Sequence, residues 1–103
     1  MEKLRKPRDW VVEAIRAEGV GNIYVAYPTP LYKTPLFQRR EGHGLGCPWT
    51  CPYYKGKAQY EPLPNAEWAA ERVATLLVMP NLTEQDAADT ATAIKKVLNA
   101  VRR

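Results

Sequence analysis

The stretch Asn81–Arg103, "NLTEQDAADTATAIKKVLNAVRR", carries a helical period along most of its length. Thr83 is followed three residues later by Asp86, a pattern like the capping box that begins a helix. One apolar stripe then follows, formed by Ala87, Ala91, Ile94, Leu98 and Val101. The sequence therefore predicts a helix over residues 84–102.

Two shorter helices are predicted before it. Residues 7–18 begin with Pro7, which suits a first helical turn, and are followed by Gly19, which suits the position after a helix. Residues 64–75 begin with Pro64 and have apolar residues four apart. Both segments have the length and the end signals of short amphipathic helices.

Two strands are predicted between these helices. In residues 22–27, "NIYVAY", the side chains of Ile23, Val25 and Tyr27 alternate with those of Tyr24 and Ala26, and the segment is rich in β-branched and aromatic residues. Residues 76–80, "LLVMP", form a brief apolar run that ends at a proline. This order of elements predicts an α+β fold, with a small antiparallel sheet packed against about three helices.

The segment Tyr27–Gln38, "YPTPLYKTPLFQ", contains three prolines. Proline fixes φ and biases the preceding residue toward extended geometry, so we expect Tyr27, Thr29 and Thr34 to be extended. The segment is then an ordered wall, which either lines a ligand site or covers a core. A long loop over residues 39–63, rich in glycine, proline and aromatic residues, follows as an insert in a single small domain, residues 1–103.

The composition limits the classes of partner that we expect for the chain. Its formal charge of +4 comes mostly from the two ends of the sequence. At the C-terminal end, cations in a last helical turn complement the helix dipole, so nucleic acid is not the favoured partner. No charged-then-apolar leader follows Met1, and no stretch approaches the roughly 18 apolar residues of a membrane span. We therefore expect no membrane association and a cytoplasmic location.

His43, Cys47 and Cys51 form an H-x3-C-x3-C series. Structural zinc usually needs four ligands and no further cysteine or histidine is present, so we expect no metal and two reduced, partly buried thiols. A cysteine nucleophile activated by His43 stays open, although no third group is evident to orient the base.

The loop also leaves open an alternative function. Its aromatic residues alternate with Arg39, Arg40, Lys55 and Lys57, and such a surface can stack single-stranded nucleic acid or bind a protein partner as a stand-alone module. No RNA-binding or helix-turn-helix signature supports this alternative.

From about Arg8 onward the chain resembles the C-terminal part of the DegT/StrS family of pyridoxal-phosphate-dependent sugar aminotransferases. The cysteine- and tyrosine-rich insert is similar to the branch called glutamine:scyllo-inositol aminotransferase. The segments that carry the resemblance are "RDWVVEAIRAEGV", "YPTPLYKTPLF", "CPWTCPYYKGKAQY" and "LPNAEWAAERVATLLVMPNLTEQDAADTATAIKKVL".

The resemblance implies a division of labour between domains. Family members hold pyridoxal phosphate in a large N-terminal domain, whose lysine bonds to it. That domain's motifs are absent here, so we expect this chain to have no catalytic, cofactor-binding or metal-binding residue and to be inactive alone. It would be a C-terminal domain, a split subunit or a fragment, and its partner would be the large domain or subunit.

The resemblance also implies a site. Tyr27, Pro28, Thr29 and Tyr32 would line the sugar or cyclitol side of the active-site cleft, with His43 and Trp49 facing it as well. The alternative is that this wall only packs beneath the insert.

The resemblance further implies a missing strand before the first helix of the small domain. We therefore expect an exposed edge on the strand at 22–27, which is covered by the "MEKLRK" arm or paired in a homodimer. The alternative is a stable monomer in which the insert covers the exposed surface.

Overall fold

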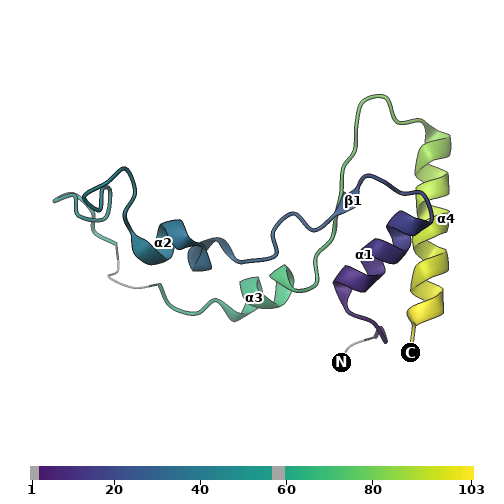
Figure 1. Cartoon of the computed structure of the whole chain (residues 1–103), viewed down its shortest axis with the longest axis horizontal. Helices are drawn as coiled ribbons and strands as arrows, with labels where there is room; N and C mark the ends of the chain where they lie inside the picture. Colours follow the sequence, from purple (N-terminus) through teal and green to yellow (C-terminus); the bar gives the residue numbers. More distant parts are fainter. Residues whose placement is uncertain (1–2, 57–59) are drawn as a thin grey trace. The chain divides into compact units, whose positions relative to one another are not determined.

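The computed structural model describes residues 3–56 and 60–103, and over these the chain has an α+β fold (Figure 1). The predicted class, a small antiparallel sheet packed against helices, is confirmed. Close contacts divide the chain into two compact units: residues up to Ala26 together with Arg72–Arg103, and Tyr27–Glu71. The elements are α1 (Arg8–Ala17), β1 (Ile23–Tyr24), the 3-10 helix η1 (Leu31–Lys33), α2 (Pro35–Arg39), α3 (Pro64–Ala70), β2 (Thr75–Leu76) and α4 (Glu84–Val101).

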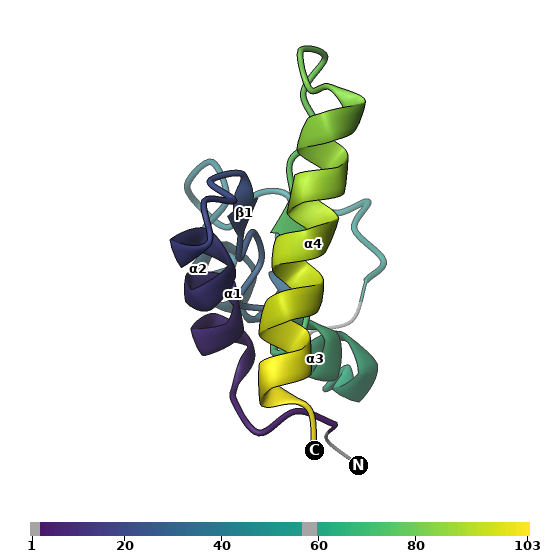
Figure 2. The same ribbon diagram turned by 90° about the vertical axis from the view of Figure 1, so that its right-hand side faces the viewer.

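In the first unit α1 and α4 lie side by side (Figures 1 and 2). Their facing side chains, together with two residues of the α1–β1 connection and β1, form the core. Each such aliphatic side chain contributes about 1.5–3 kcal/mol when buried, so this small core accounts for much of the unit's stability. The buried residues are Val11, Val12, Ile15, Val20, Ile23, Ala93, Val97 and Val101.

The start of α4 follows the predicted capping box. The backbone N–H of Asp86 donates to Thr83 Oγ1 at 3.2 Å, and the backbone N–H of Thr83 donates to Asp86 Oδ2 at 2.8 Å. The helix prediction is confirmed to within one residue, but part of the predicted stripe is wrong, because Ala87 and Ala91 are exposed. The cause is length: α1 has 10 residues and α4 has 18, so α1 cannot cover the first turns of α4.

The sheet is shorter than predicted. β1 pairs antiparallel with β2, with Ile23 opposite Leu76, and neither strand fills its expected range of 22–27 or 76–80. Beyond β1 the prolines at 28 and 30 lack the N–H that a ladder needs. Beyond Leu76 the antiparallel register would place the next partners in the turn that follows α1.

Over its described residues, 3–6, the N-terminal arm does not cover the edge of β1, so that alternative is wrong there, while the homodimer stays a prediction. Leu4 instead forms an antiparallel bridge with Arg102, and the backbone N–H of Arg5 donates to the carbonyl of Val101 at 2.8 Å. This part of the arm therefore lies beside the end of α4 (Figure 1). The side chain that does contact β1 comes from α1: Arg16 Nε donates a hydrogen bond to the carbonyl of Ile23 at 2.8 Å. Residues 1 and 2 of the arm lie outside the described residues.

In the second unit the proline-rich wall is only partly extended. Thr34 is extended, as predicted, with φ −69° and ψ 152°. The residues on either side of it form η1 and α2, which corrects the expectation of a continuous extended wall. Pro35 favours α2, because the first position of a helix needs no N–H donor.

The remainder of the second unit is the loop and α3. Within the described residues no helix or strand interrupts the chain between Arg39 and Pro64, which confirms the predicted loop; residues 57–59, with Lys57, lie outside this description. The helix predicted over 64–75 is too long, since α3 ends at Ala70 and β2 begins at Thr75. No helix in the described ranges is both long and apolar enough to cross a bilayer.

Candidate functional site

The residues proposed for the sugar-side wall begin with an exposed stretch. Tyr27 has 81% of its surface exposed, and Pro28 and Thr29 are also exposed. An aromatic face can pack on the C–H groups of a sugar or cyclitol ring, while a hydroxyl gives a directional hydrogen bond. Tyr27 and Thr29 present both kinds of group to solvent.

Tyr32 is held differently from that stretch. Its hydroxyl donates a hydrogen bond to the carboxylate of Glu67 on α3 and accepts one from the backbone N–H of Leu63 at 3.3 Å. Gln38 Nε2 donates to the Tyr32 carbonyl at 2.6 Å. The hydroxyl of Tyr32 is therefore used to join η1 to α3, which leaves its ring as the group that could face a ligand.

Lys33 completes this contact. Its Nζ lies 2.9 Å from Glu67 Oε2, and the hydrogen bond to Glu67 raises the pKa of Lys33. The pKa of Glu67 is lowered, first by the hydrogen bond from Tyr32 and then by that from Lys33. At neutral pH the carboxylate is charged and the amine is protonated, so Lys33 is not a nucleophile. Sequence reasoning missed Glu67 as a partner of Tyr32, although the P-x-A-E pattern marks its position.

Trp49 belongs to an aromatic cluster in the loop. The ring of Phe37 packs edge-on against Trp49 and against Tyr60, each with ring centroids 6.0 Å apart, and Trp49 Nε1 donates to the hydroxyl of Tyr60 at 3.0 Å. The guanidinium of Arg40 lies over the Tyr60 ring at 4.6 Å. Burial, and secondarily a hydrogen bond with Tyr60, raises the pKa of Tyr54 beside this cluster. These rings pack on one another and on Arg40, which leaves less ring surface for stacking nucleic acid bases.

His43 lies at the start of the same loop and is exposed. Its backbone N–H donates to the carbonyl of Cys47 at 3.3 Å, so the chain folds back on itself there. Gly42 permits this close approach, because its φ is +55° and a Cβ would collide with the Cys47 carbonyl. Cys47 and Cys51 are both free thiols in this structure. Cys51 is half-buried, as expected, but Cys47 is exposed, so the expectation of a partly buried thiol is wrong there. Over the described ranges no group of three or more His, Cys, Asp or Glu side chains is placed to hold a metal.

All six predicted site residues lie in the second unit, but in three places. Tyr27, Pro28 and Thr29 form the exposed stretch, Tyr32 joins η1 to α3, and His43 and Trp49 belong to the loop. Among the described residues, no hydrogen bond, ion pair or ring contact joins Tyr27, Pro28 or Thr29 to His43 or Trp49. The first three therefore form the candidate wall, and Tyr32 is placed beside it by the chain.

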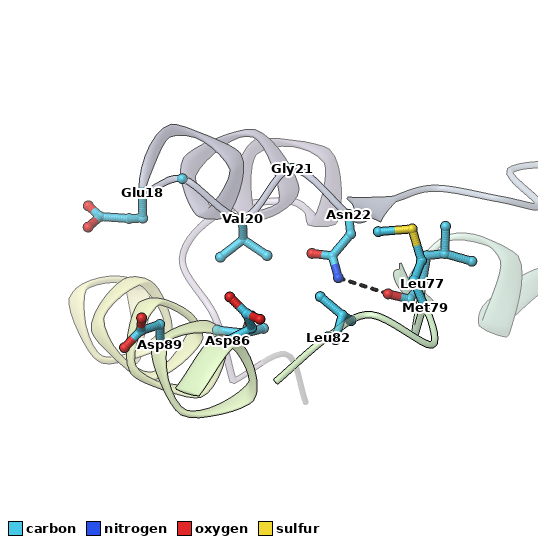
Figure 3. A pocket seen from close by; sticks show the side chains of 11 residues that line it. Glu18, Val20, Gly21, Asn22, Leu77, Met79, Leu82, Asp86 and Asp89 are labelled. Carbon is cyan, nitrogen blue, oxygen red and sulfur yellow. Dashed lines mark hydrogen bonds between the residues drawn. The ribbon is translucent and has the colours of Figure 1, made fainter. Parts of the chain in front are cut away.

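A hollow in the first unit is the other candidate site (Figure 3). It has a volume of about 630 Å³ and was not anticipated from the sequence. On one side of the hollow, Asn22 Nδ2 donates a hydrogen bond to the carbonyl of Leu77 at 2.8 Å. Apolar side chains and three carboxylates line it, so an anion such as a phosphate would be repelled. The lining side chains include Val20, Leu77, Met79 and Leu82, with Glu18, Asp86 and Asp89.

All three of those carboxylates already have partners. Lys96 Nζ lies 2.6 Å from Glu18 Oε2, Asp86 is the capping residue of α4, and Gln85 Nε2 donates to Asp89 Oδ1 at 2.8 Å. The hydrogen bonds from Thr83 lower the pKa of Asp86. The carboxylates are thus explained by a surface ion pair, helix capping and a hydrogen bond along α4, and the hollow carries no reaction chemistry of its own.

Comparison with known proteins finds a distant relative, an uncharacterized protein of Methanocaldococcus jannaschii, MJ1066. The chain is 26% identical to it over 102 residues, which make up 99% of the chain. The chain spans only 22% of the length of that protein. No protein family and no solved structure matches the chain.

Proposed function

We propose that this chain is the C-terminal small domain, or a fragment of it, of a pyridoxal-phosphate-dependent sugar or cyclitol aminotransferase of the DegT/StrS kind. Its role is to supply the sugar-side wall of the active site. The observation that carries this proposal is the exposed stretch Tyr27–Thr29, which begins the Y-P-x-P-L motif and offers a free aromatic ring beside a hydroxyl. A cytoplasmic location accompanies the proposal.

The order of elements supports the proposal. α1 ends just before the E-G-V motif, α3 begins at the proline of P-x-A-E, and α4 begins after the threonine of T-x-x-D. Each family motif thus falls at the end of an element, where a motif fixes the local backbone. An order of caps and turns that follows the motifs is more specific than composition, which is ordinary for a globular chain.

The partner would be a large pyridoxal-phosphate-binding domain or subunit. When bound there, the cofactor supplies the carrier for the transferred amino group. The residues of this chain do not fit it: the amine of Lys33 is protonated and paired with Glu67, that of Lys96 is paired with Glu18, and the hollow of the first unit is acidic. The relative, of which the chain spans 22%, supports a place within a longer protein.

The individual roles follow from exposure and contacts. Tyr27 packs its ring against the C–H groups of the sugar or cyclitol, and Thr29 donates or accepts a hydrogen bond at one of its hydroxyls. Pro28 and Pro30 restrict the backbone between them, so the two side chains lose little conformational entropy on binding. Tyr32 is a positioning residue, because its hydroxyl is bonded to Glu67.

The test is ligand-observed saturation-transfer NMR with scyllo-inositol and with methyl α-D-glucopyranoside. We expect transfer to the ring protons of at least one probe and its loss in Tyr27→Ala. Tyr53→Ala is the matched control, because Tyr53 is 87% exposed and lies in the same unit. Equal transfer in all three proteins, or transfer in none, would contradict the proposed wall.

A further inference from the structure

Two thiols occupy one short turn of the loop. Cys47 is exposed, Cys51 is half-buried, and both are reduced. They are four residues apart, and Trp49 lies midway between them. Thiol–disulfide exchange begins with attack by an accessible thiolate, and a second thiol of the same chain can then resolve the mixed disulfide.

The backbone between the two cysteines is folded into turns. The N–H of Thr50 donates to the carbonyl of Gly46 at 3.0 Å, and the N–H of Cys51 donates to the carbonyl of Pro48 at 3.0 Å. These two bonds fold the chain back between Gly46 and Cys51, so the segment that joins the two cysteines is not extended. A disulfide needs its two Cα atoms within about 7 Å of each other, and a folded segment with only three residues between the cysteines favours that approach.

We propose that Cys47 and Cys51 form a dithiol site that closes reversibly to a disulfide by exchange with a low-molecular-weight disulfide such as oxidised glutathione. The Cys47 thiolate attacks one sulfur of glutathione disulfide, the S–S bond breaks, and one glutathione thiolate leaves. The Cys51 thiolate then attacks the sulfur of Cys47, and the second glutathione thiolate leaves. Two electrons pass from the cysteine pair to glutathione, and the protons lost by the cysteines are taken up by the leaving thiolates.

The order of these steps follows from exposure. Cys47 meets the reagent first because it is the exposed thiol, and Cys51 resolves the mixed disulfide from within the turn. Closure tethers the backbone on both sides of Trp49, whose ring contacts Phe37 and whose Nε1 bonds to Tyr60. Oxidation of the two cysteines therefore changes the environment of the Trp49 indole within the aromatic cluster.

The test uses the full chain with mixtures of oxidised and reduced glutathione, followed by intact-mass analysis, thiol titration and light scattering. The wild-type chain should lose two thiols and two hydrogens, bind no glutathione and keep its oligomeric state. Cys51→Ser should instead accumulate one stable glutathione adduct at Cys47. Cys47→Ser should react at least about tenfold more slowly, because its remaining thiol is less accessible.

A second measurement tests proximity without oxidation. Phenylarsine oxide bridges two nearby thiols, so the reduced wild-type chain should bind one equivalent and either serine variant none. Stable adducts carrying two glutathione groups, a disulfide between chains, or failure of the wild-type chain to bind the arsenical would overturn the proposal. Oxidation should also change the tryptophan emission, and this change should be absent in Cys51→Ser.

Discussion

The hydroxyl of Tyr32 donates a hydrogen bond to the carboxylate of Glu67, which lies 35 residues later in the sequence. The same carboxylate accepts from Lys33 at 2.9 Å. One side chain of α3 therefore holds two residues of η1, Tyr32 and Lys33, and this contact closes the second unit across the long loop. It also fixes the backbone immediately after the exposed wall residues.

This contact should depend on pH. The pKa of Glu67 is lowered in the folded chain, so its contribution to stability is present above its ordinary value and is lost as the pH falls through the lowered value. The pKa of Lys33 is raised, so its contribution is present below its ordinary value and is lost as the pH rises through the raised value. Carbon-detected NMR titration should place the pKa of Glu67 below the ordinary value of a glutamate side chain.

The Tyr32→Phe variant separates the two hydrogen bonds that lower the pKa of Glu67. It removes the hydrogen bond that lowers the pKa of Glu67 most, so the titration of Glu67 should move toward the ordinary value. An unchanged Glu67 titration in Tyr32→Phe would contradict the contact.

The cap of α4 gives a second prediction. Thr83→Ala removes the side-chain acceptor for the N–H of Asp86 and should lower the free energy of unfolding by about 1 kcal/mol, measured by urea denaturation. Thr92→Ala on the same helix is the control: Thr92 is exposed and bonds only back to the carbonyl of Ala88, so its loss should be neutral or slightly stabilising. Equal losses in the two variants would show that Thr83 does not cap the helix.

A third prediction concerns the folded-back loop. Gly42→Ala places a Cβ against the carbonyl of Cys47 at a positive φ, so the turn must open and the tryptophan emission from Trp49 should shift. Gly21→Ala is the control, because no atom lies within 4 Å of a Cβ there and its φ is not positive. An unshifted emission spectrum in Gly42→Ala would be inconsistent with the close approach of residues 42 and 47.

The features that the sequence predicted well are those with local causes. Thr83 and Asp86 cap α4 through bonds between residues three apart. Pro7 and Gly19 flank α1, and the backbone N–H of Gly19 donates to the carbonyl of Arg16 at 2.9 Å. The errors have non-local causes. The length of β1 depends on which residues β2 places opposite it, and the exposure of Ala87 depends on where α1 ends.

The candidate site shows the same contrast between local and non-local causes. The motif identified Tyr27, Pro28 and Thr29, and their exposure is compatible with a wall. It could not show that the hydroxyl of Tyr32 is bonded to Glu67, since that contact joins segments separated by the loop. Trp49 was predicted to face a cleft, and its bond to Tyr60 instead depends on how the loop folds.

A fourth prediction concerns the cofactor. The purified chain mixed with pyridoxal phosphate and reduced with borohydride should show no stoichiometric, lysine-specific adduct in peptide mass spectra, because the amine of Lys33 is protonated and paired with Glu67. Scattered substoichiometric labelling of exposed lysines is the expected background. Full modification of a single lysine would place the cofactor in this chain and refute the proposed division of labour.

The central claim, that the Tyr27–Thr29 stretch is a sugar-binding wall, is tested most directly by position-resolved chemical-shift mapping. The ¹⁵N-labelled chain is titrated with whichever of scyllo-inositol or methyl α-D-glucopyranoside shows saturation transfer. The amide shifts should be largest at Tyr27, Thr29 and Tyr32, with an affinity of about millimolar or weaker because the other half of the pocket lies in another domain. Shifts centred on the acidic hollow, which is lined by the α1–β1 connection, the β2–α4 connection and the first turns of α4, or on the loop around Trp49, would contradict the account.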